Sequence, residues 1–84
     1  MSYDSVMSKV SQSQALKAED AEKIIYIFEN AIRDVSPEHF GFFSEVIKAA
    51  HEALQMEDAY YLDELLPKLL SENWHILEEY DMRF

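Results

Sequence analysis

The strongest pattern of apolar and polar positions in the chain lies between Ser36 and Leu54. Ser36 has a side-chain oxygen suited to capping a helix, and Pro37 has the fixed φ that favours the first helical position. Apolar residues then recur at three- and four-residue steps, on one helical face: Phe40, Phe43, Ile47, Ala50 and Leu54, flanked by Val46 and Ala53. We expect this face to be buried under the other helices.

A second helix is predicted from about Ala18 to Val35, with Leu16 placed as a hydrophobic staple before it. Its apolar stripe follows the helical period: Ala21, Ile24, Phe28, Ala31, Ile32 and Val35. Ile25, Tyr26 and Ile27 widen this stripe beyond the one face that a surface helix buries. Either two neighbouring helices cover the wide stripe, or part of it forms an interface.

A last helix is predicted after Asp58, which is a suitable N-cap. Its stripe is the longest in the chain: Leu62, Leu65, Leu66, Leu69, Leu70, Trp74, Leu77 and Tyr80. Pro67 lies inside this stripe, lacks an N–H and clashes with the preceding turn, so the helix kinks or breaks there. The stripe stays in phase across Pro67, which favours a kink; in a break, Ser71 would cap the second piece.

The N-terminal part has a weaker pattern. Tyr3, Val6, Met7 and Val10 are spaced for one face of a short first helix, which ends in the polar run of residues 11–14. A helix this short is marginally stable in water, so it either docks on the bundle or frays. The apolar pattern defines the structure of residues 1–16 less clearly than that of any other segment.

The pattern as a whole predicts an all-α fold. One glycine and two prolines leave few turn signals for a sheet, and 49% hydrophobic residues are enough for a folded core. Short connections favour antiparallel neighbours. We therefore expect residues 1–84 to form a single domain, a small three- to four-helix bundle with mainly antiparallel neighbouring helices.

The hydrophobic core of so small a domain contributes little stability, and a homodimer would add to that stability. Gly41, inside the third helix, indicates either a neighbouring backbone that approaches closely or a neutral replacement without a packing role.

The net charge of the chain indicates which kinds of partner it can bind. The chain has 17 acidic and 7 basic residues, a net charge of −10, with −3 in residues 1–42 and −7 in residues 43–84. This balance disfavours direct binding to nucleic acid or to an anionic membrane and permits a protein partner with a basic surface. Because the chain has no cysteine, no basic and apolar leader and no apolar run of about 18 residues, we expect a cytoplasmic protein.

Candidate chemistry is sparse. Glu72 and His75 form one E-x-x-H step, as in ferritin-like di-iron bundles, which need two such steps and two more glutamates. Only a dimer would supply them, with Glu29, Glu45 or Glu52 as further ligands. His39 and His51 point about 120° apart on one helix and are expected at the surface. With neither a P-loop nor a nucleophile motif, we predict no enzyme activity, no cofactor and no metal, and keep the dimeric metal enzyme as an alternative.

The main functional signal is the acidic stretch from Glu52 to Asp81, where nine acids accompany Lys68 alone. With its aromatic residues it predicts a partner-binding surface, made of these residues: Glu57, Asp58, Tyr60, Tyr61, Asp63, Glu64, Glu72, Trp74, Glu78, Glu79, Tyr80 and Asp81. The alternative is a charged surface without a binding role, which only keeps the protein in solution, with aromatic rings that cap a small core.

These observations predict a non-enzymatic protein-binding module, an adaptor, immunity protein or inhibitor. In general texture the segment AHEALQMEDAYYLDELLPKLL, residues 50–70, resembles small bacterial helical adaptors and chaperone-like proteins, without a motif that assigns residue roles. Two further alternatives stay open. The carboxylates mimic phosphates, as in small phage-encoded anti-defence inhibitors, or the protein is a structural homo-oligomer that pairs through its second helix.

Overall fold

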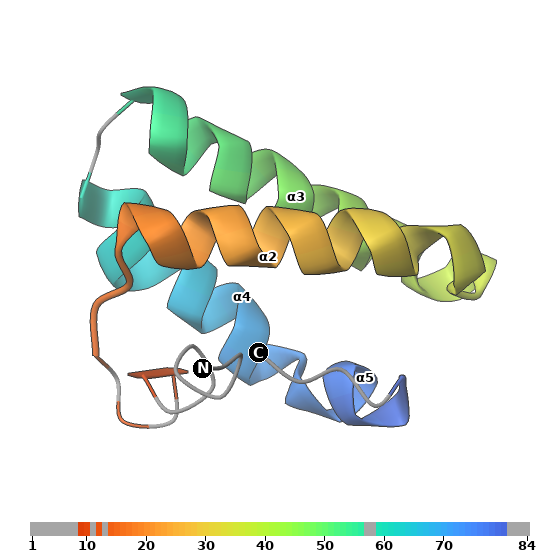
Figure 1. The fold of residues 1–84 in the computed structure, drawn as a ribbon. Helices are drawn as coiled ribbons and strands as arrows, with labels where there is room; N and C mark the ends of the chain where they lie inside the picture. Colours follow the sequence, from red (N-terminus) through yellow and green to blue (C-terminus); the bar gives the residue numbers. More distant parts are fainter. Residues whose placement is uncertain (1–8, 11, 13, 57–58, 81–84) are drawn as a thin grey trace.

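The computed structural model describes residues 9–10, 12, 14–56 and 59–80. In this part of the chain the regular elements are helical, which confirms the predicted all-α fold (Figure 1). None of these helices is long and apolar enough to cross a lipid bilayer. The elements, including a 3₁₀ turn (η1) and a π-helical turn (η2), follow in this order: α2 (Ala18–Ala31), η1 (Ile32–Asp34), α3 (Pro37–Met56), η2 (Tyr61–Leu65), α4 (Leu66–Glu72) and α5 (Trp74–Glu79).

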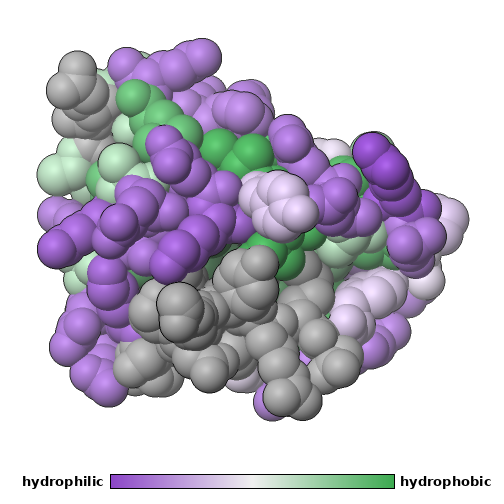
Figure 2. Space-filling view, viewed as in Figure 1, coloured by the Kyte–Doolittle hydropathy of each residue, from purple (hydrophilic) through white to green (hydrophobic). Residues whose placement is uncertain are grey.

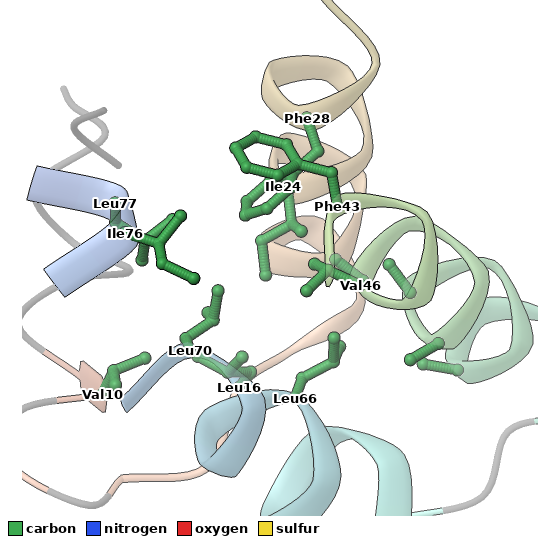
Figure 3. Packing of buried hydrophobic residues seen from close by; sticks show 14 residues of the cluster. Val10, Leu16, Ile24, Phe28, Phe43, Val46, Leu66, Leu70, Ile76 and Leu77 are labelled. Atoms are coloured by element: carbon green, nitrogen blue, oxygen red, sulfur yellow. The ribbon is translucent and has the colours of Figure 1, made fainter. Parts of the chain in front are cut away.

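Helices α2 and α3 run antiparallel, and α4 and α5 lie along one side of this pair (Figure 1). The core fills the space between them (Figure 3). Phe28 from α2 packs on Phe43 from α3, with ring centroids 5.0 Å apart, and both side chains are fully buried. Leu66 and Leu70 of α4 are also fully buried. The stripes predicted for the second and last helices therefore do form the core or pack against it.

The buried face of α3 differs from the predicted one. Phe40 is 53% exposed, whereas Val46 and Ala53, expected only to flank the face, are among its most buried residues. Ile47 is half-buried. The helix is thus rotated so that small residues, including Ala49 and Ala53, face inward, and small side chains let neighbouring helices approach closely.

Helix α2 begins at Ala18, as predicted, and a buried carboxylate caps it. The Asp20 side chain is almost fully buried and accepts the backbone N–H of Lys17 at 2.8 Å. It also accepts the Lys9 ammonium at 2.8 Å. Because Val10 is buried in the core as well, the described end of the predicted first helix docks on the bundle.

Helix α2 ends earlier than predicted. The α-helix stops at Ala31, and residues 32–34 tighten into the 3₁₀ turn η1. Val35 is already extended, with φ −82° and ψ 154°. The prediction of a helix to Val35 was wrong because the chain must leave the helix before the bend that leads to Pro37.

The wide stripe of α2 is largely covered within the chain. Ile25 and Ile27, on the two sides of the core face, are half-buried and pack against the core. Tyr26 is 64% exposed. Figure 2 shows hydrophobic side chains between α2 and α3 with polar ones around them. Packing against the core thus accounts for most of this stripe.

The irregularity predicted at Pro67 takes the form of a π-helical turn. The Leu66 N–H donates to the Tyr61 carbonyl, five residues earlier, so the helix is widened directly before the proline. This widening accommodates a residue that has no N–H and crowds the preceding turn. The helix continues through Pro67 and is interrupted at Asn73, which has φ −116° and ψ 28°. Ser71 does not cap a second piece, since its hydroxyl donates to the Lys68 carbonyl at 3.3 Å.

Gly41 has no close neighbour, contrary to the expectation of a nearby backbone. A Cβ atom at this position would meet nothing within 4 Å. We therefore expect Gly41→Ala to stabilise the fold by about 0.5–1 kcal/mol, because alanine lowers the entropy of the unfolded chain and favours the helix. Urea unfolding followed by circular dichroism measures this change. A loss of stability would mean that another group occupies this space.

Candidate partner-binding surface

Residues 59–80 contain five acidic residues, and the side chains of all five are exposed. Residues 59–80 carry these five acids against Lys68 alone, a net charge of −4 in 22 residues, whereas residues 14–56 carry −4 in 43 residues. Leucines from the same elements are buried, with Leu66 and Leu70 at 0% and Leu77 at 1% exposure. We call the five exposed side chains the acidic segment: Asp63, Glu64, Glu72, Glu78 and Glu79.

No ion pair joins the acidic segment to a cation among the residues that the structure describes. Lys68, the lysine of the same region, is exposed and unpaired there too. These exposed carboxylates attract cations within a screening length of about 8 Å. Glu57, Asp58 and Asp81, also predicted for this surface, lie outside the described residues.

A shallow depression of about 230 Å³ brings part of the acidic segment together. Asp63, Lys68 and Glu72 line it, together with Val10 from the N-terminal segment. The N-terminal segment is also tied to this region through the Leu16 N–H, which donates to the Leu62 carbonyl at 3.1 Å. The depression is thus a junction between chain segments that has two carboxylates and one ammonium group.

The four predicted aromatic residues differ in exposure. Tyr60 is 51% exposed, while Tyr61, Trp74 and Tyr80 are half-buried and pack against the core. Tyr60 stands against Tyr61 in a T-shaped pair, with ring centroids 5.7 Å apart. Tyr60 therefore presents the most accessible ring of the set, held in place by its neighbour.

Tyr80 makes contacts with the start of α3 that the periodic pattern of apolar residues did not predict. Its hydroxyl oxygen accepts the Ser36 backbone N–H at 2.9 Å and lies 2.8 Å from His39 Nδ1. Its ring packs edge-on against Phe43, at a centroid distance of 5.6 Å. Tyr80 thereby fastens the end of α5 to the start of α3.

His39 is consequently not the surface residue that the sequence suggested. Its side chain is only 14% exposed, because the Tyr80 ring lies edge-on beside it, 5.5 Å between centroids. The other histidine of α3 does lie at the surface: His51 is half exposed and sits 3.4 Å from the Glu29 carboxylate of α2. Neither histidine joins the acidic segment.

The E-x-x-H step does not lie on one continuous helix. Glu72 is the last residue of α4, His75 belongs to α5, and Asn73 interrupts the helix between them. Of the other proposed ligands, Glu29 contacts His51 and Glu45 is exposed on α3. In the described ranges, no three histidine or acidic side chains come close enough together to hold a metal ion.

Asp20 and Lys9 are the charged pair that the sequence did not reveal. Asp20 fits the general preference for acids in the first helical turn, which gave no reason to expect burial. Eleven residues separate it from Lys9. A periodic pattern cannot signal such a contact, since it depends on how the N-terminal segment folds back onto α2.

No protein-family model, curated protein or solved structure matches this chain.

Proposed function

We propose that this protein is a non-enzymatic binding module that docks a partner protein with a basic surface through its acidic segment. One observation carries the proposal: five exposed carboxylates in residues 59–80 have no ion-pair partner among the described residues. A surface of this kind speeds the encounter with a cationic partner and selects against anionic ones. An adaptor, an immunity protein and an inhibitor would all use it in this way.

The exposed aromatic side chains support a role of the acidic surface in binding a protein, rather than only in keeping the chain in solution. Tyrosine, tryptophan and methionine are enriched in protein interfaces, while a face that only keeps a protein in solution has no use for them. Tyr60 and Met56 are 51% and 60% exposed near the acidic segment in sequence. We place the complex in the cytoplasm, where a chain with no cysteine loses nothing in the reducing environment.

Charge reversal in α5 tests the proposal. We expect Glu78→Lys with Glu79→Lys to abolish capture of basic proteins from a lysate of the host of origin, because two attractive charges become repulsive. Wild type should retain these proteins at about 50 mM salt and release most of them at about 500 mM. Quantitative mass spectrometry of the captured proteins, with circular dichroism to verify the fold, provides the measurement.

The matched control reverses two exposed acids on α2, Glu19 and Glu22. This variant has the same net charge as the α5 variant, so it should capture the same proteins as wild type if position decides binding. If both variants lose capture equally, or if capture does not depend on salt concentration, the acidic segment is not the contact.

Nucleic-acid mimicry is the second candidate, favoured by the charge density of residues 59–80, twice that of residues 14–56. Carboxylates would then stand where a nucleic-acid-binding protein expects phosphates. Adding duplex DNA to the capture experiment separates the two functions. Mimicry requires that DNA displaces the captured protein, and an adaptor for another protein surface requires that it does not.

A further inference from the structure

Among the described residues, four large apolar side chains are more than half exposed: Tyr26, Phe40, Met56 and Tyr60. Met56 ends α3, and Tyr60 directly precedes η2, so these two flank the corner where the chain turns from α3 toward α4 (Figure 1). Exposed Asp63 and Glu64 follow Tyr60 within one helical turn. At this corner, apolar surface and unpaired carboxylates occur next to each other.

The helical geometry places Tyr60 and Glu64 on the same side. Residues 59–60 are helical and η2 continues from Tyr61 to Leu65, and residues three or four apart are neighbours on a helix surface. Both side chains are exposed, as is that of Asp63. The ring of Tyr60 therefore has the Glu64 carboxylate on its side of the helix.

The Tyr60 ring is also supported from within. Tyr61 is half-buried and packs against the core, and the two rings meet at an interplanar angle of 71°. A ring held in this way loses little freedom when a ligand stacks on it, which favours binding.

A ring face beside a carboxylate matches one side chain better than any other. The arginine guanidinium is planar, stacks on aromatic rings and binds a carboxylate through two parallel hydrogen bonds. Lysine carries a compact and strongly hydrated ammonium, which gains less from either contact. A second copy of this chain would bring its own charge of −10, which opposes self-association at this corner.

We propose that Tyr60, together with Glu64, anchors an arginine side chain of the basic partner. This inference rests on the proposed function and makes it more specific, since it predicts a preference for arginine over lysine at equal charge. Met56 offers apolar surface at the same corner for a residue next to that arginine.

Two fluorescein-labelled peptides test the anchor by fluorescence anisotropy: one alternates arginine and alanine, and the other has lysine at every arginine position. We expect wild type to bind the arginine peptide roughly fivefold more tightly. Tyr60→Leu should reduce this ratio to about two and leave the affinity for the lysine peptide nearly unchanged, because leucine keeps apolar area but has no ring face, while Glu64 still favours arginine. Tyr60→Phe should keep the ratio.

Phe40→Leu is the matched control, because Phe40 on α3 is a similarly exposed aromatic residue, 53% against 51% for Tyr60, and no acidic residue lies three or four positions from it. It should leave the ratio unchanged. Equal binding of the two peptides to wild type, or an arginine preference that Tyr60→Leu does not reduce, would overturn the anchor. If both peptides bind equally and both lose affinity in the α5 charge-reversal variant, the anchor fails and the proposed function stands. If neither peptide binds at low salt, both fail.

Discussion

Phe28→Ala is expected to destabilise the protein by about 3–5 kcal/mol, the largest effect of any single substitution considered for this chain. Phe28 is fully buried and joins α2 to two rings of α3, with centroids 6.1 Å from Phe42 and 5.0 Å from Phe43. A domain of this size has a free energy of unfolding of about 5–10 kcal/mol, so the variant should be partly unfolded near 37 °C. Urea and thermal unfolding followed by circular dichroism measure the loss.

A nearby exposed aromatic residue provides the control for Phe28. Tyr26 lies two residues earlier on α2 and is 64% exposed, so Tyr26→Ala should change the free energy of unfolding by no more than about 0.5 kcal/mol. Similar losses at the two positions would contradict the packing of α2 on α3 described above.

Asp20→Ala should produce the second largest effect, a loss of about 2–3 kcal/mol. The carboxylate is 1% exposed, caps α2 through the Lys17 N–H and pairs with Lys9, both at 2.8 Å. Alanine removes the cap and leaves the Lys9 ammonium, whose side chain is 23% exposed, without its partner. Equilibrium unfolding in urea measures this effect.

Two further variants separate the cap from the ion pair. Asp20→Asn keeps a side-chain oxygen for the Lys17 N–H and loses the charge, so it should fall between wild type and Asp20→Ala. Glu19→Ala, at an exposed position in the same helical turn, should stay within about 0.5 kcal/mol of wild type. If Asp20→Ala behaves like Glu19→Ala, the buried ion pair contributes nothing to stability.

The proposed binding residues depend on this packing for their position. Glu78 and Glu79 lie on α5, whose inner side buries Ile76 and Leu77 and whose end is fastened to Ser36 by Tyr80. Tyr60 and Glu64 lie at the opposite end of the last helical region, before Pro67. Charge reversal at α5 and ring removal at Tyr60 therefore probe separate parts of the protein, and both can be made without changing the core.

Periodic patterns predicted most of the fold because each depends on neighbours in sequence. The starts of α2 and α3, the stripe of leucines in the last helix and the outward carboxylates all follow from helical spacing and from the transfer of apolar side chains out of water. The acidic segment could be found in the same way, since charge and its position along a helix are properties of the sequence alone.

Only the tertiary structure decided which side of α3 faces the centre and which distant residues meet. Periodicity placed Phe40 on the inward face of α3 and Val46 at its flank, whereas in the structure Val46 is fully buried and Phe40 is 53% exposed. The contact of His39 with Tyr80 joins residues 41 apart, and that of Lys9 with Asp20 joins residues 11 apart. These contacts depend on the path of the whole chain, because a hydrogen bond requires two groups within about 3 Å and local sequence does not bring them there.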